Sequence, residues 1–211
     1  MIPRNVTDLV ESPKPIKVSH TIWTVEQSRH FLEGTKSSRF YPMYCLAFIG
    51  LRFGQILGLG VEDFNQKNKT ITIKQQVQFI PGKGLKITVP KTESSKRTIK
   101  LPDFVYEALQ SHILKENQRL IFETSNRTPF SYRNFVANFK KESEKLGLPE
   151  IRFHDLRHFS VSYLINELKI PPKVVQDIIG HATINLTMEV YNHTTTDQQN
   201  EAMEIMSRNF I

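Results

Sequence analysis

Apolar residues recur at helical spacing along most of the chain. Thr24, followed three residues later by Gln27, forms a capping box, which predicts a short helix ending near Gly34. The same spacing predicts a second helix over Ser38–Gly50, whose apolar stripe contains Cys45 and assigns this thiol to the core. The other predicted helices are a short one that follows Arg52 and stops among Gly58 and Gly60, then Asp103–Glu116, Ser131–Leu146, His154–Glu167, Pro171–Ile179, Leu186–Tyr191 and Thr196–Arg208.

Between the third and fourth predicted helices, the pattern changes to that of a β-sheet. Two segments rich in β-branched residues, Thr70–Ile80 and Leu85–Val89, flank the turn sequence Pro81–Gly84. Thr98–Leu101 is expected to add a third strand. The pattern therefore predicts a mainly α, α+β domain with a small three-stranded antiparallel sheet.

Composition and length fit one soluble globular domain. The chain has 211 residues, of which 39% are hydrophobic, and its single cysteine cannot form an internal disulfide, so we expect a reducing, cytoplasmic location. No apolar run approaches the ~18 residues of a membrane span, and we expect no membrane partner. Prolines and lysines before residue 21 indicate a linker or arm over 1–20, followed by a main domain over 21–195 and a C-terminal helix over 196–211.

Positive charge is concentrated in the predicted sheet. The chain has 28 Lys and Arg against 21 Asp and Glu, a net charge of +7. A basic sheet can bind a phosphate backbone, because neutralised phosphates release their condensed counterions. A solvated sheet edge protected by lysines from aggregation is the alternative. The candidate DNA-binding residues are Lys74, Lys83, Lys86, Lys96, Arg97 and Lys100.

Three polar residues near the C-terminus have the chemistry of a phosphoryl-transfer site. His154 and Arg157 are three residues apart and share a helix face, where arginine can bind phosphate and histidine can move a proton. Tyr191 can act as a nucleophile once its proton is removed. Each residue also has a structural interpretation: a core histidine, an ion-pair partner of Asp155 or Glu189, and a core aromatic residue.

A zinc site is the other interpretation of this segment. His154 and His158 have the His-x-x-x-His spacing of metalloproteases. That motif requires Glu after the first histidine, whereas this chain has Asp155, and Arg157 would place a cation beside the metal. We therefore expect no metal and assign His158 to packing or to support of the site.

The order of these motifs is more specific than any one of them. Read together, the chain resembles the catalytic domain of tyrosine recombinases, the phage integrase family, from about Ile22 to Arg208. The matching motifs, in chain order, are Leu51-Arg52-Phe53-Gly54, Pro90-Lys91-Thr92, His154-Asp155-Leu156-Arg157-His158, Gly180-His181-Ala182 and Tyr191-Asn192-His193.

The resemblance implies an enzyme that cleaves and rejoins DNA without metal, ATP or another cofactor. Arg52 and Arg157 would hold the scissile phosphate. Tyr191 would attack phosphorus to form a 3′-phosphotyrosyl bond, His154 would take part in proton transfer, and His181 would donate a hydrogen bond to the phosphate.

The general acid implied by the resemblance is Lys91, which would protonate the leaving 5′-oxygen. Lys96 and Lys100 lie nearby in the sequence and are alternative candidates. The family usually has Glu or Asp three residues after the first arginine, whereas this chain has Gln55, which can orient its neighbours but carries no charge. We interpret Gln55 as tuning the site.

The resemblance also implies an assembly on double-stranded DNA. The helix over 196–211 would dock on a neighbouring protomer in a tetramer, and an accessory directionality factor can accompany such enzymes. The helical domain that usually precedes the catalytic domain is not recognised in this sequence, so we expect either a fragment, which the linker-like segment 1–20 favours, or an unusually short family member. The alternatives are a type IB topoisomerase, which shares the tyrosine chemistry, and a non-catalytic DNA-binding module.

Overall fold

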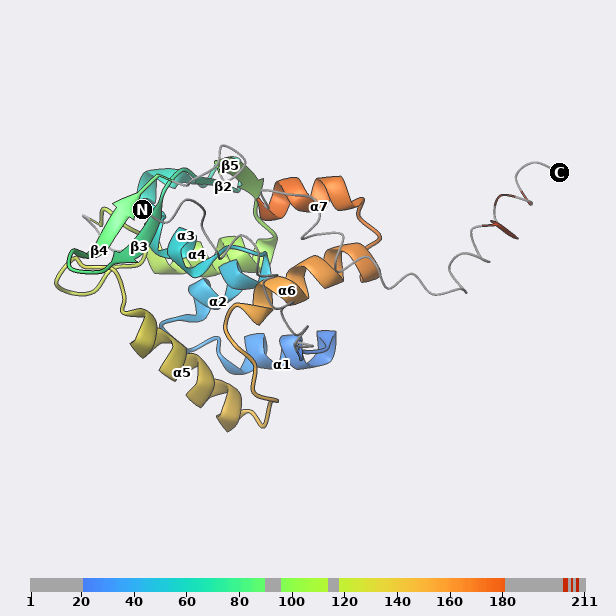
Figure 1. Cartoon of the computed structure of the whole chain (residues 1–211), viewed down its shortest axis with the longest axis horizontal. Coiled ribbons are helices and arrows are strands. Elements are labelled where there is room, and N and C mark those ends of the chain that lie inside the picture. Colours follow the sequence, from blue (N-terminus) through green and yellow to red (C-terminus); the bar gives the residue numbers. More distant parts are fainter. Residues whose placement is uncertain are drawn as a thin grey trace, which may run out of the picture.

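The computed structural model describes residues 21–89, 96–113, 118–180, 203–204, 206 and 208. This part of the chain is mainly helical, with two small antiparallel sheets at one side (Figure 1). The fold is therefore α+β, as the sequence predicts. The elements are α1 (Val25–Gly34), α2 (Tyr41–Phe48), α3 (Phe53–Gly58), a 3₁₀ turn (Val61–Asp63), β1 (Phe64–Asn65), β2 (Thr70–Ile73), β3 (Gln76–Ile80), β4 (Gly84–Thr88), β5 (Arg97–Lys100), α4 (Asp103–Ile113), α5 (Tyr132–Lys145), α6 (Asp155–Ser162), a π-helical turn (Tyr163–Glu167) and α7 (Pro172–Ile179).

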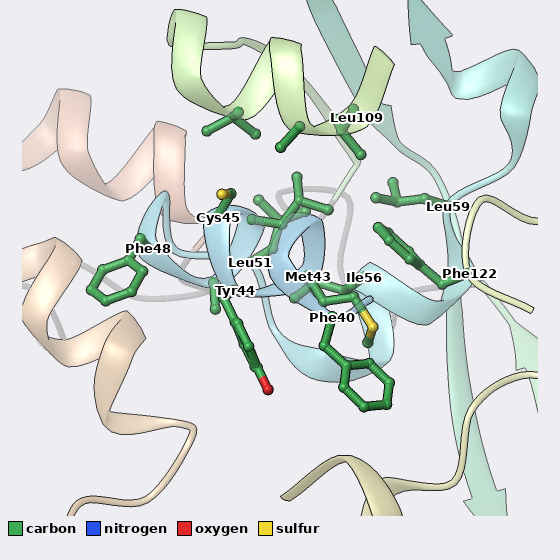
Figure 2. Packing of buried hydrophobic residues seen from close by; sticks show 14 of the residues in the cluster. Phe40, Met43, Tyr44, Cys45, Phe48, Leu51, Ile56, Leu59, Leu109 and Phe122 are labelled. Carbon is green, nitrogen blue, oxygen red and sulfur yellow. The ribbon is translucent and has the colours of Figure 1, made fainter. Parts of the chain in front are cut away.

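Helix α2 lies at the centre of the molecule (Figure 1), and every residue from Pro42 to Phe48 is buried. A helix that is apolar on all sides must be covered on all sides, and α1, α3, α4 and α6 contact it. Figure 2 shows Cys45 and Tyr44 on different sides of α2, and Leu109 of α4 packed close by. Cys45 is fully buried, which confirms its assignment to the core, and burial raises the pKa of its thiol to about 12.

An aromatic cluster fixes α1 and α5 against the central helix. Phe31 of α1 packs edge-on against Tyr44 and Phe139, with ring centroids 5.0 and 5.3 Å apart. The Tyr44 hydroxyl donates a hydrogen bond to the Glu142 carboxylate over 2.6 Å, so this buried tyrosine keeps its polar atom satisfied. The outer helices therefore form a rigid support for the α2–α3 turn.

The strands pair differently from the prediction. The predicted strand Thr70–Ile80 is divided into β2 and β3, because Lys74 and Gln75 between them do not pair with a neighbouring strand. Lys74 pairs with Asp63 over 2.7 Å, and the Gln75 side chain donates to the Gly58 carbonyl over 2.8 Å. As a result, β2 pairs with β1 and β5 in a three-stranded antiparallel sheet, while β3 and β4 form a separate hairpin.

The predicted helix His154–Glu167 has two parts. It begins as α6 at Asp155 and continues as the π-helical turn from Tyr163. A second apolar cluster joins these parts to α7, which ends at Gly180 in the left-handed conformation with φ +71°, as the glycine stop predicts. The cluster consists of Val161, Ile165, Val175 and Ile179.

Several predicted segments lie outside the described residues. They are the arm over 1–20, the helix Leu186–Tyr191 and most of the helix Thr196–Arg208, of which residues 203, 204, 206 and 208 are helical. Within the described part of the chain, no helix has the length and hydrophobicity needed to cross a membrane.

Candidate phosphate-binding site

The first arginine of the site lies where α2, α3 and α7 meet. Arg52 directly precedes α3 and is half-buried, and its backbone N–H donates to Gln55 Oε1 over 3.0 Å. Its side chain contacts a residue far away in the sequence, because Nη1 donates to the Gly180 carbonyl over 3.3 Å. Arg52 therefore joins the beginning of α3 to the end of α7.

The second arginine reaches the same region from α6. Arg157 lies in the first turn of α6, and its Nη1 donates to the Gly50 carbonyl in the α2–α3 turn. Gly50 has φ +91°, a conformation that residues with a Cβ rarely adopt, so glycine allows the turn to present this carbonyl. The two arginines are thus held by neighbouring backbone segments.

Arg157 is the most constrained cation of the site. Only 3% of its surface is exposed, and its buried Nη2 has no hydrogen-bond acceptor among the residues that the structure describes. Burial, together with the nearby charges of Arg52 and Arg97, lowers the pKa of Arg157 to about 8. A buried guanidinium with an open donor is suited to binding an anion, and an oxyanion such as phosphate matches its planar fork.

His154 lies beside the arginines at the solvent-exposed rim. Desolvation of its ring, with the charges of His158, Arg157 and Arg52, lowers the pKa of His154 to about 4. The imidazole is therefore neutral near pH 7 and can accept a proton. The rings of His154 and His158 are perpendicular, with centroids 5.2 Å apart.

An acidic residue fixes the turn that carries His154. Asp155 is buried and accepts hydrogen bonds from the Arg152 backbone N–H over 2.8 Å and from Arg152 Nη2 over 2.7 Å. Although burial opposes ionisation, these bonds hold the pKa of Asp155 below its usual value. Asp155 therefore pairs with Arg152, and the alternative of an Asp155–Arg157 ion pair is wrong. No group of three or more metal-ligating side chains occurs among the described residues.

The remaining predicted site residues are placed as follows. Lys83 and Lys86 are exposed on the β3–β4 hairpin, and Lys96 and Lys100 are exposed at β5. Lys74 follows β2 and forms ion pairs with Asp63 and Glu62. Lys91, His181 and Tyr191 lie outside the described residues.

Arg97 is the residue whose position the sequence analysis missed. It was expected among the lysines of the sheet, but it points inward, where its charge lowers the pKa of Arg157. The signal was present in the sequence, because Arg97 alternates with Thr98 and therefore shares a face with buried Ile99. The described site thus contains three guanidiniums and one neutral imidazole.

Comparisons with known proteins identify the family of this chain. Residues 24–198 match the model of the phage integrase family. The chain is 27% identical over 210 residues to a tyrosine recombinase XerC-like protein of Caldanaerobacter subterraneus, covering 88% of this chain and 54% of that protein. It is 26% identical over 214 residues to the transposase from transposon Tn916 of Enterococcus faecalis, covering 90% of this chain and 52% of that protein. The chain therefore spans about half the length of these relatives.

A solved structure shows the same fold. The Tn1549 transposon integrase, in complex with a circular intermediate DNA, superposes on this chain with a TM-score of 0.81 at 24% identity. The superposition covers 97% of this chain and 70% of that one. Because the family model spans most of the sequence, this chain belongs to the phage integrase family.

Proposed function

We propose that residues 21–195 form the catalytic domain of a site-specific DNA recombinase that cleaves and rejoins DNA through a 3′-phosphotyrosyl intermediate. The observation that supports this most is the buried Arg157, whose Nη2 has no acceptor within the described residues, beside Arg52. Two guanidiniums that converge in this way can hold the non-bridging oxygens of one phosphodiester. The solved Tn1549 transposon integrase and a XerH recombinase were both captured with DNA, which fits this substrate.

In the proposed cleavage step, Tyr191 Oη bonds to phosphorus and the bond from phosphorus to the 5′-oxygen breaks. The tyrosine proton passes to His154, which is neutral near pH 7 because of its lowered pKa. The leaving 5′-oxygen takes a proton from Lys91. Rejoining is the reverse reaction with another 5′-hydroxyl, so the phosphodiester energy is conserved and no ATP is required.

The charge of the transition state is neutralised by side chains in this proposal. Arg52 and Arg157 bind the equatorial oxygens, and His181 donates a further hydrogen bond. These groups supply the positive charge that Mg²⁺ supplies in metal-dependent nucleases, so we propose a metal-independent reaction. The flanking DNA backbone would be bound by four exposed lysines, Lys83, Lys86, Lys96 and Lys100. We propose that the reaction takes place in the cytoplasm.

The proposal is tested by selecting DNA that becomes covalently attached to the protein. A library of nicked duplexes with a randomised core is incubated with the full chain, and bound DNA is washed under denaturing conditions. A nick beside the cleavage point lets the short 5′-hydroxyl fragment diffuse away and traps the adduct. We expect enriched core sequences attached at Tyr191 by peptide mapping, and no adduct with Tyr191→Phe.

Other outcomes would identify the alternatives. An adduct that persists in Tyr191→Phe would refute the assigned nucleophile. Binding of DNA without any adduct would support a non-catalytic module. Relaxation of supercoiled plasmid without strand exchange between two duplexes would support a topoisomerase.

We also propose that the segment 196–211 docks on a neighbouring protomer and links a tetramer on DNA, with an accessory factor setting direction. Two residues of its apolar stripe, Met203 and Met206, are 61% and 54% exposed in the single chain. An apolar groove of about 840 Å³ beside α6 and α7, lined in part by Phe104, Leu168 and Val174, offers a surface of matching character. Truncation after His193 is expected to weaken cooperative assembly, measured by analytical ultracentrifugation with DNA, and unchanged assembly would refute this docking.

A further inference from the structure

Arg97 connects the three-stranded sheet to the end of α7. It begins β5, which lies beside α7 (Figure 1), and its Nε donates to the Ile178 carbonyl over 2.6 Å. Ile178 lies in the last turn of α7, where helix carbonyls have no partner within the helix. A side chain from a β-strand therefore caps the helix that leads into the site.

The guanidinium of Arg97 also covers Gly180. A Cβ at Gly180 would lie 2.8 Å from Arg97 Cζ, a distance that real Cβ atoms do not adopt. Gly180 is left-handed with φ +71°, a conformation that favours glycine, and the Arg97 guanidinium would have to move away from a Cβ at this position. The Gly180 carbonyl accepts a hydrogen bond from Arg52 Nη1. Arg97 and Arg52 therefore contact the same residue at the end of α7.

This arrangement has an electrostatic cost. Burial, with the charge of Arg52, lowers the pKa of Arg97 to about 10, and Arg97 in turn lowers the pKa of Arg157. An arginine that serves only to attract phosphate can do so from an exposed position, where its guanidinium stays hydrated and no cost of burial arises. Arg97 is instead partly buried against backbone, which indicates that its contacts to α7 and Gly180 matter as well as its charge.

We propose that Arg97 is a positioning residue for the phosphate-binding site, which fixes the end of α7 and, through the Gly180 carbonyl, the guanidinium of Arg52. This inference rests on the proposed function, because it assumes that Arg52 binds phosphate. It predicts that a planar guanidinium is required at position 97. A lysine retains the charge but cannot donate through Nε while covering Gly180.

Isotope labelling gives a direct readout, because the sequence has two Ile–Gly peptide bonds, at Gly50 and Gly180, and one Ile–Ile bond, at Ile178–Ile179. Chains labelled with ¹³C-carbonyl isoleucine and ¹⁵N-glycine therefore give two amide signals in a carbonyl-filtered NMR spectrum. These signals come from the amides of Gly50 and Gly180, the residues whose carbonyls accept hydrogen bonds from Arg157 and Arg52. Labelling with ¹⁵N-isoleucine instead reports the Ile178 carbonyl that accepts from Arg97.

The experiment titrates inorganic phosphate into the wild-type full chain, Arg97→Lys, Arg97→Gln and the control Lys141→Ala, which removes an exposed cation from α5. We expect Arg97→Lys to shift the Gly180 and Ile178–Ile179 signals before phosphate is added and to raise the phosphate Kd at least five-fold. Arg97→Gln should weaken binding further, and the control should match the wild type. Near-ultraviolet circular dichroism verifies that each variant is folded.

Two results would overturn the proposal, and they differ. If Arg97→Lys binds phosphate as the wild type does and leaves the Gly180 signal in place, Arg97 acts only as a charge. If the wild-type signals of Gly50 and Gly180 do not respond to phosphate, the phosphate site and the proposed function fail together with the role of Arg97.

Discussion

Replacing Arg157 by methionine should make the protein more stable while removing the proposed phosphate site. The guanidinium is 3% exposed, and in the described part of the chain no carboxylate forms an ion pair with it. Its positive charge also faces those of Arg52 and Arg97. Methionine has a similar straight side chain without charge, so the substitution removes the electrostatic cost and retains most of the packing.

The size of the effect follows from the pKa. The pKa of Arg157, lowered to about 8, sets an upper bound of about 6 kcal/mol on the cost of the charged form at pH 7. This cost is present in full below about pH 8 and decreases as pH rises, because the folded state loses the proton before the unfolded state does. The substitution also leaves the Gly50 carbonyl without its donor, which costs about 1–3 kcal/mol.

Relaxation and water penetration reduce the cost of a buried charge, so we expect a net gain of about 1–3 kcal/mol, within the range of about 1–4 kcal/mol for replacing buried ion pairs by apolar residues. For a domain of this size, each kcal/mol raises Tm by about 2–4 °C. The assay is urea unfolding at pH 7 in low salt, with Arg133→Met on the exposed face of α5 as the matched control. The control should change stability by less than about 0.5 kcal/mol.

Phosphate gives the second half of the test. At ten times its Kd, phosphate should stabilise the wild type by about 1.4 kcal/mol, because it binds only the folded state. Arg157→Met should show no such stabilisation. A variant that is less stable than the wild type, or that phosphate stabilises equally, would refute the interpretation of Arg157 as a strained anion-binding residue.

Three further predictions concern the support of the site. Gly54→Ala should lower the free energy of unfolding by about 1–3 kcal/mol, measured by urea unfolding. A Cβ at this position would lie 2.6 Å from the Val77 carbonyl oxygen and push the β3–β4 hairpin away from α3. Unchanged stability would contradict this close packing. Tyr44→Phe should cost about 1–2 kcal/mol, since it removes the 2.6 Å bond to Glu142, and Tm measures the loss. His154→Gln should flatten the dependence of the unfolding free energy on pH between pH 6.5 and 4. The wild type loses stability as pH falls through this range, because its unfolded state binds a proton before its folded state does. Parallel profiles of the two chains would contradict the lowered pKa.

The sequence predicted the elements whose ends are set by local chemistry. The capping box at Thr24 and Gln27 forms with reciprocal bonds of 2.9 and 3.2 Å, and Gly180 ends α7 in the left-handed conformation. Both signals act between residues a few positions apart, so no tertiary information is needed to interpret them. The buried face of Cys45 was predicted for the same reason, since helical spacing alone places it on the apolar stripe.

Strand pairing could not be predicted in the same way. A run such as Thr70–Ile80 has the composition of one long strand, and the break at Lys74 and Gln75 depends on Asp63 and Gly58, which precede it by more than ten residues. The pairing of β2 with β5 likewise depends on a strand more than twenty residues away. Apolar alternation indicates which face of a strand is buried but not which strand lies beside it.

Part of the candidate site could be predicted from local spacing, and part of it depends on tertiary packing. His154 and Arg157 could be paired from their spacing, and spacing also excludes the Asp155–Arg157 ion pair, because residues two apart lie on different faces of a helix. Arg152, three residues before Asp155, was the better partner. The convergence of Arg52, Arg97 and Arg157 could not be predicted, since it is created by the packing of α3 and α6 on α2 and of β5 on α7.

Gln55 shows how this convergence affects the chemistry. The sequence left open whether an amide in place of the family's usual carboxylate disturbs the first arginine. In the structure, buried Gln55 Oε1 accepts from the Arg52 backbone N–H, a bond that a carboxylate would also make, so the position of Arg52 is preserved. What the amide does not supply is negative charge beside three guanidiniums that repel one another. The unliganded site is therefore less stable, and an incoming phosphate removes more repulsion than it would beside a carboxylate. We therefore expect Gln55 to retain the geometry of the site and to increase its affinity for an anion, compared with a carboxylate at the same position.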